Sequence, residues 1–231
     1  MEPRRRLTSA ARDLLGVLEK GAVPAAPALL GATLVSEVGG RVTVRITEVE
    51  AYREDDPASH SFRGPTGRTA VMFGPAGVLY VYFVYGMHWA ANVSCGPPGR
   101  GEAVLIRAGE VVEGADLARA RRVSARRDVD LARGPARLAS AMGFDRDVLG
   151  VDLLGERSPV RLTAGAEVPS YVTGPRVGVN VATEVPWRWW VTGDPTVSAF
   201  RSGTRRRQTG PATPSTDDPA GLQAARPKKQ R

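Results

Sequence analysis

Cysteine, lysine and histidine are scarce in this chain of 231 residues. It has one cysteine, Cys95, and two histidines. A single cysteine forms no disulfide within the chain and cannot build a thiolate metal cluster, which favours a reducing compartment such as the cytoplasm. The lysines are Lys20, Lys228 and Lys229, so chemistry that needs a lysine amine as nucleophile has no candidate between residues 21 and 227.

Long hydrophobic runs are also missing. No stretch approaches the roughly 20 apolar residues of a membrane span, and the basic N-terminus is followed by an amphipathic segment, which argues against a signal peptide. The length favours a single core, whereas apolar residues nearly vanish after residue 201. We therefore expect a basic arm over residues 1–6, one folded domain over 7–201 and a disordered basic tail over 202–231. The expected protein is a cytoplasmic monomer without membrane contact.

Positive charge is concentrated at the two ends of the chain. The formal net charge is +8, of which residues 1–6 contribute +2 and residues 202–231 contribute +5. A positive excess of this kind indicates a polyanionic partner such as nucleic acid. The folded part carries almost none of the excess, so charge by itself is a weak indication of function.

The periodicity of apolar residues predicts helices and strands in alternation with glycine-rich turns. The predicted helices cover residues 8–19, 24–30, 112–122 and 135–142. The predicted strands cover residues 32–38, 41–52, 78–85, 88–94, 103–109, 159–163, 176–181 and 187–192. The polar segment 53–77 between strands reads as a long loop, which usually carries function when it is ordered.

One predicted strand changes from apolar to acidic along a single face. Alternate residues of a strand share a face, and the residues that share it here are Val42, Val44, Ile46, Glu48, Glu50 and Tyr52. Two interpretations are open. The strand leaves the core after Ile46 and its glutamates meet water, or a carboxylate lies at the edge of a cleft, partly desolvated and available as a general base.

Aromatic residues and a histidine follow this strand in the sequence. His60 lies in the long loop, where a single histidine is usually incidental. Tyr80, Tyr82 and Tyr85 fall within six residues of a predicted hairpin, and Tyr85 abuts its turn. These tyrosines are either ordinary strand aromatics or a platform on which bases stack, with Tyr85 as a wedge between base pairs.

Taken together, these segments resemble the alkyladenine (3-methyladenine) DNA glycosylase family. The order and spacing of the matching motifs hold over roughly residues 10–201. The matching segments are Glu48-Val49-Glu50-Ala51-Tyr52, His60-Ser61, Met72-Phe73, Gly77-Val78-Leu79-Tyr80-Val81-Tyr82, Tyr85-Gly86-Met87, Asn92-Val93-Ser94, Ala103-Val104-Leu105-Ile106-Arg107-Ala108, Gly134-Pro135-Ala136-Arg137-Leu138, Arg176-Val177-Gly178-Val179 and Gly193-Asp194-Pro195-Thr196-Val197-Ser198.

The resemblance implies catalytic roles for a small group of residues. Glu50 would be the general base that activates the hydrolytic water. Arg107 and a backbone carbonyl near Val177 and Val179 would assist it. The products would be a free base and an intact abasic site, since none of the lysines lies in the region that carries the motifs and a lyase step needs an amine.

The resemblance also implies how DNA is held. Tyr52, His60, Tyr82 and Asn92 would line the pocket for the flipped base, and Asn92 would discriminate against normal guanine by crowding its exocyclic amine. Tyr85 would fill the gap in the duplex. The implied phosphate contacts are Arg68 and the segment Gly134–Leu138 with Arg137.

The implied architecture is a single mixed α+β domain in which helices flank a curved antiparallel sheet and a hairpin protrudes toward the DNA. The implied partner is double-stranded DNA with alkylated or deaminated purines, and no cofactor or metal is implied. Two alternatives stay open. One is a metal-dependent hydrolase that uses Glu48, Glu50, His60 and His88, although no compact ligand spacing such as HExxH is present. The other is a catalytically silent module that binds damaged DNA.

Overall fold

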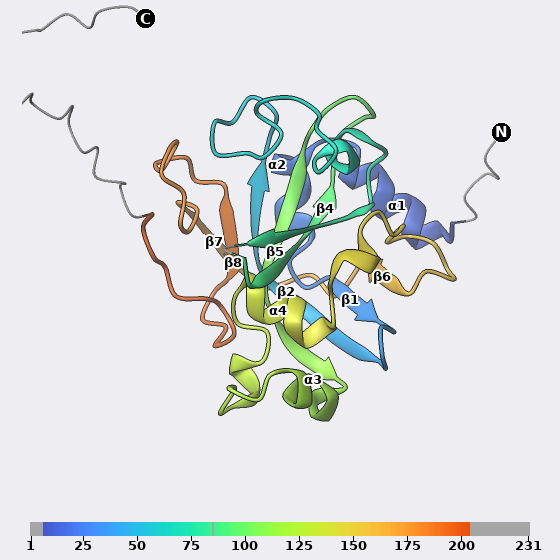
Figure 1. Ribbon diagram of the computed structural model, residues 1–231, viewed down its shortest axis with the longest axis vertical. Helices are drawn as coiled ribbons and strands as arrows, with labels where there is room; N and C mark the ends of the chain where they lie inside the picture. The colour runs from blue at the N-terminus through green and yellow to red at the C-terminus, as the bar shows by residue number, and fades with distance from the viewer. Residues whose placement is uncertain (1–6, 85, 204–231) are drawn as a thin grey trace, which may run out of the picture.

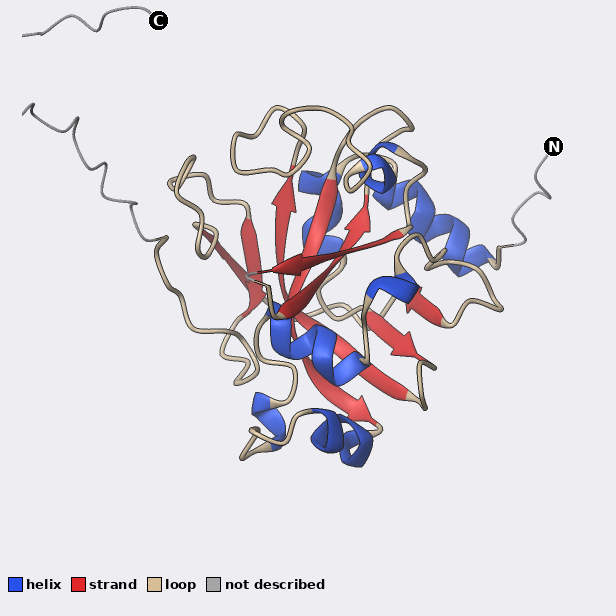
Figure 2. Ribbon diagram, in the orientation of Figure 1, coloured by secondary structure: helices blue, strands red, loops and turns tan. Residues whose placement is uncertain are grey.

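An antiparallel sheet runs through the centre of the molecule, with helices packed around it (Figures 1 and 2). The computed structural model describes residues 7–84 and 86–203. The predicted basic arm, Tyr85 and all but the first two residues of the predicted tail lie outside the described residues. Within that part of the chain, none of the helices is long and apolar enough to cross a membrane.

The sheet has eight strands in the order β3-β4-β5-β2-β1-β6, with β8 paired to β2 and β7 paired to β8. The strands are β1 (Thr33–Ser36), β2 (Val42–Tyr52), β3 (Leu79–Val84), β4 (His88–Ser94), β5 (Ala103–Glu113), β6 (Val160–Thr163), β7 (Tyr171–Gly174) and β8 (Arg188–Val191). One edge of β2 pairs with β1 along the first half of the strand and with β8 along the second half. The other edge of β2 pairs with β5 along the whole strand. Register shifts between Ile46 and Val49 bend the strand at this transition.

Four α-helices within the described residues complete the mixed α+β domain, which confirms the predicted fold class. They are α1 (Ser9–Leu18), α2 (Ala22–Ala28), α3 (Ala115–Arg121) and α4 (Pro135–Met142). Helix α1 is capped at its N-terminus by Thr8, whose hydroxyl accepts a hydrogen bond of 3.1 Å from the Ala11 amide. Helix α2 packs on β2 and β5, α4 packs on β4 and β5, and α3 packs on α4. The protruding position of the β3–β4 hairpin stays a prediction.

Most predicted elements agree with the structure, but the strand predicted at 176–181 is wrong. The strand in this part of the chain is β7, which ends at Gly174, and residues 176–181 are irregular. Pro175 has no amide hydrogen to give to a sheet, and Gly178 has a φ of +75°. The amide of Val177 donates to a glutamate side chain instead of a neighbouring strand. The backbone of this segment therefore bonds to a side chain of the candidate site and not to a neighbouring strand.

Candidate active site

The acidic half of β2 is buried, not solvated. The side chains of Glu48 and Glu50 are both 0% exposed, so the interpretation in which these glutamates meet water is wrong. In this half β2 has a neighbour on each edge, β5 and β8, and both of its faces are covered. Because an ionised carboxylate is costly to bury without partners, the contacts of each glutamate indicate how its charge is compensated.

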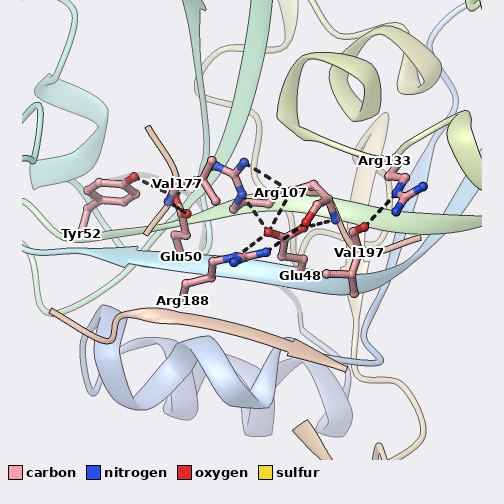
Figure 3. Close-up of polar contacts among 9 residues, drawn as sticks. Glu48, Glu50, Tyr52, Arg107, Arg133, Val177, Arg188 and Val197 are labelled. Carbon is pink, nitrogen blue, oxygen red and sulfur yellow. Dashed lines mark hydrogen bonds and ion pairs between the residues drawn. The ribbon is translucent and has the colours of Figure 1, made fainter. Parts of the chain in front are cut away.

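Glu50 is held by three donors (Figure 3). The Val177 amide donates to Oε1 at 2.7 Å, the Tyr52 hydroxyl donates to Oε2 at 2.8 Å, and Arg107 Nη1 lies 3.3 Å from Oε2. Burial, reinforced by the charge of Glu50, raises the pKa of Tyr52 well above its ordinary value. The phenol therefore stays protonated and donates a hydrogen bond to Glu50.

Arg107 connects the two glutamates. Its Nε donates to Glu48 Oε1 at 3.0 Å while Nη1 reaches Glu50, and Nη2 lies 3.4 Å from the Ser198 hydroxyl. Burial alone would disfavour the charged guanidinium, but Glu50 and Glu48 outweigh it and raise the pKa of Arg107. The site thus contains a permanent cation with a fixed orientation.

Glu48 accepts more hydrogen bonds from the protein than Glu50 does. Besides Arg107, it accepts hydrogen bonds from Arg188 Nε at 2.7 Å, from the Ser198 amide at 2.7 Å and from the Ser198 hydroxyl at 2.9 Å. Arg188 and Ser198 were not among the predicted site residues. An available signal was the arginine in the otherwise apolar run 187–191, because a buried cation requires a buried anion.

The four predicted base-pocket residues lie together. Tyr52, His60, Tyr82 and Asn92 line one small pocket of 70 Å³. The ring of His60 meets Tyr82 edge-on, with centroids 4.4 Å apart. Asn92 is buried in the pocket lining, and its Nδ2 donates to the backbone carbonyl of Tyr80 at 3.1 Å.

Electrostatics keep this pocket uncharged. Partial burial, followed by the positive charge of Arg68, lowers the pKa of His60 below its ordinary value, so the imidazole is neutral at neutral pH. The His60 Nδ1 lies 3.2 Å from the hydroxyl of Tyr80. Burial also raises the pKa of Tyr80 to about 12. A neutral aromatic pocket can accommodate a cationic ring without charge repulsion.

This pocket opens into a larger cleft of 790 Å³. The cleft is lined by Tyr52, His60 and Tyr82, which it shares with the pocket, and by four further predicted site residues. These are Arg68, Arg107, Val177 and Val179. Glu50 lies directly behind Tyr52, Arg107 and Val177, the three residues that donate to it. Arg137 lines an adjoining groove instead.

Arg176 anchors the irregular segment that supplies Val177. Its guanidinium forms an ion pair with Asp56, and both side chains are buried. Nη1 also donates to the Ala51 carbonyl at 3.1 Å, and the guanidinium lies 4.7 Å from the centre of the Tyr52 ring. This one side chain fixes the Val177 segment against the end of β2 and against a wall of the cleft.

The four residues of the metal-hydrolase alternative are not brought together. Glu48 and Glu50 are engaged by arginines, His60 packs on Tyr82, and His88 lines the adjoining groove. Among the described residues, no group of three or more histidine, cysteine or acidic side chains is arranged to hold a metal ion. The arginines occupy the positions around the carboxylates that a cation would need.

The tip of the β3–β4 hairpin carries exposed apolar side chains. Phe83 is 48% exposed and Met87 is 67% exposed. Tyr85, the predicted wedge, lies between them in sequence and outside the described residues. Exposed apolar residues at a hairpin tip are the side chains that can insert between base pairs.

Comparison with known proteins adds an independent line of evidence. The family model described as methylpurine-DNA glycosylase matches residues 16–195. A protein from Streptomyces avermitilis, named provisionally as a 3-methyladenine DNA glycosylase, is 52% identical over 189 residues, which cover 79% of this chain and 89% of that protein. One from Frankia casuarinae with the same name is 48% identical over 210 residues, covering 86% of this chain and 97% of that protein.

Proposed function

Because the chain belongs to the methylpurine-DNA glycosylase family, we propose that it flips a damaged purine out of duplex DNA and hydrolyses the N-glycosidic bond with a water activated by Glu50. The substrates are alkylated or deaminated purines, and the step begins base excision repair. The observation that carries the proposal is a buried, ionisable carboxylate held by three donors directly behind the cleft that contains the base pocket.

Hydrolysis of an N-glycosidic bond develops positive, oxocarbenium-like charge on the sugar. A carboxylate next to that carbon stabilises the charge and removes a proton from the attacking water, as carboxylates do in glycosidases. Glu50 is suited to both tasks. A carboxylate has about four acceptor positions, and the protein occupies three of those of Glu50. One position is left to take the proton of a water.

The water must reach Glu50 through the layer that covers it. Tyr52, Arg107 and Val177 form that layer and line the cleft. We place the water between them in the DNA-bound enzyme, where Arg107 and a carbonyl of Val177 or Val179 orient it. Catalytic hydrogen bonds often tighten only when the substrate is bound.

Recognition of the base follows from the neutral aromatic pocket. A cationic alkylated purine stacks favourably on the faces of Tyr52 and Tyr82, by on the order of 0.5–2 kcal/mol per contact. Neutral His60 contacts the edge of the base. Asn92 is fixed by its bond to the Tyr80 carbonyl, so it cannot withdraw from the exocyclic amine of a normal guanine, and it excludes that base by crowding.

Flipping needs contacts outside the pocket. Tyr85 fills the gap that the flipped nucleotide leaves, and Arg68 and Arg137 contact phosphates beside it. Damaged bases cost less to unstack than normal ones, which adds selectivity before chemistry begins.

The reaction ends at the abasic site. A lyase step requires an amine that forms a Schiff base with the sugar, and the sequence has no lysine from residue 21 to residue 227. The enzyme is therefore monofunctional.

Single-turnover reactions test the proposal. Duplexes that carry 3-methyladenine, 7-methylguanine, hypoxanthine or ethenoadenine are incubated with excess enzyme, and free base and strand breaks are measured separately. We expect free base from at least one duplex, with breaks only after alkaline treatment. A covalent adduct trapped by borohydride would contradict the monofunctional mechanism. Lesion binding without base release would favour the silent module.

A further inference from the structure

A second, strongly basic hollow adjoins the cleft. We call it the basic groove. It has a volume of 630 Å³, and Arg122, Arg126, Arg127 and Arg137 line it together with one acid, Asp130. The lining comes from the end of α3, the loop after it and the exposed side of α4. Of this lining, the resemblance implied phosphate contacts only for the segment Gly134–Leu138 with Arg137.

Most of the positive charge in the basic groove is not neutralised by the protein. Arg127 forms an ion pair with Asp130 at 2.9 Å. Among the residues that the structure describes, Arg122, Arg126 and Arg137 form no ion pair. Burial, followed by the nearby charge of Arg137, lowers the pKa of Arg122. Arg122 and Arg137 thus line one groove without an ion-pair partner among the described residues, and a bound anion would relieve the repulsion between them.

Arg122 is held in place as a donor. Its Nε donates to the Leu131 carbonyl at 3.2 Å, and its Nη1 donates to the Ser124 hydroxyl at 3.3 Å. These bonds use two of the five N–H groups of the guanidinium. The remaining ones are free to bind an anion, and little side-chain entropy is lost when they do, because the group is already ordered.

The basic groove is continuous with the cleft. His88, at the start of β4, and Ala136, on α4, line both hollows. His88 also follows directly on the tip of the β3–β4 hairpin. A DNA strand whose nucleotide enters the cleft would therefore bring its neighbouring phosphates close to the basic groove.

We propose that the basic groove binds the phosphodiester backbone of the duplex that flanks the flipped nucleotide, through Arg122, Arg126 and Arg137. This inference rests on the proposed function. Arginines that contact phosphates position the DNA without reading its sequence. The basic groove would therefore set the affinity and the register of the duplex, whereas Glu50 and the pocket carry out the chemistry.

Binding to undamaged duplex tests the basic groove without using the excision reaction. The binding constant of a fluorescent 24-base-pair duplex is measured from low to high salt for the wild type, for Arg126→Gln and for Arg122→Gln/Arg126→Gln. Each lost phosphate contact should reduce the slope of log K against log salt by about 0.9. We expect a reduction of about 0.9 for the single variant and about 1.8 for the double variant.

Two controls make the result specific. Arg12→Gln changes an exposed arginine of α1, which packs on α2 and β6, and should leave the slope at the wild-type value. Arg126 forms no hydrogen bond or ion pair among the described residues, so Arg126→Gln keeps the result interpretable if the double variant folds poorly. Slopes equal to that of Arg12→Gln would overturn the proposal. If the wild type releases no damaged base while the slopes still fall, the proposed function fails and the anion-binding groove stands.

Discussion

At positions 48 and 50 the same side chain has two different surroundings. Both glutamates are fully buried, but Glu48 accepts hydrogen bonds from four protein donors, two of which are arginine side chains. Glu50 has three donors and lies behind the cleft wall. Glu48 thus fixes the orientation of Arg107, and we propose that Glu50, which lies behind the cleft wall, is the carboxylate that carries out the chemistry.

The substitution Glu48→Gln tests this division at the residue scale. It leaves Arg107 and Arg188 buried next to a neutral amide, and breaking a buried ion pair in this way costs about 3–5 kcal/mol. We expect the free energy of unfolding, measured with urea, to fall by that amount. Ser198→Ala removes only the hydroxyl contacts and should cost about 0.5–1.5 kcal/mol. Equal stability of Glu48→Gln and wild type would show that Glu48 does not hold the arginines.

The acidic residues of this cluster could be predicted from the sequence, but their partners Arg188 and Ser198 could not. The change from apolar to acidic along one face of β2 indicates a carboxylate that is either solvated or functional, and the resemblance to the glycosylase family assigns the role to Glu50. Arg188 and Ser198 could not be assigned to this cluster, because they follow Glu48 by 140 and 150 positions in sequence. The pairing of β2 with β8 brings Arg188 to Glu48, and the chain that follows β8 brings Ser198 there.

At the scale of elements, the segment after β7 is the main departure from the predicted pattern. Its valines, Val177 and Val179, favour a strand by composition. The ion pair of Arg176 with Asp56 and the bond of the Val177 amide to Glu50 outweigh that preference. Neither partner is near in sequence, so periodicity alone could not reveal this irregular structure.

The substitution Asp56→Asn tests whether this anchor matters. It leaves the buried guanidinium of Arg176 without its charge partner, so the segment that carries Val177 loses its attachment to the end of β2. We expect stability to fall by about 3–5 kcal/mol and the single-turnover rate to fall as well. Asp55→Asn is the matched control, because Asp55 is exposed and pairs with Arg53. Similar rates for both variants would argue against a role of the anchor in the site.

For the whole molecule, the sequence predicts the separate elements better than it predicts how they close into one sheet. The predicted helices, the β1–β2 turn and the sheet strands up to β5 agree with the structure, because each depends on local spacing. The curl of the sheet does not follow from local spacing, since it requires β2 to change partner from β1 to β8.

The last described residues, Arg201 to Gly203, line the cleft, and the chain continues from there into a segment with seven basic and two acidic residues.

Deletion of residues 204–231 should therefore affect binding and not the chemical step. The segment carries a net charge of +5, and its removal should weaken the binding of undamaged duplex most at low salt. The single-turnover rate at saturating enzyme should stay at the wild-type value. Loss of that rate in the truncated enzyme would show instead that the segment contributes to the active site.

The proposed mechanism depends on Glu50 to remove the proton from the hydrolytic water. Its most direct test is the single-turnover rate of base release by Glu50→Gln on a damaged duplex, with binding of the same duplex measured alongside. The matched control is Glu102→Gln, because Glu102 is also buried but bonds to the Ala22 amide and does not line the cleft. We predict that Glu50→Gln releases base at least about 100-fold more slowly with binding retained, while Glu102→Gln keeps its rate. Base release by Glu50→Gln at the wild-type rate would contradict the mechanism.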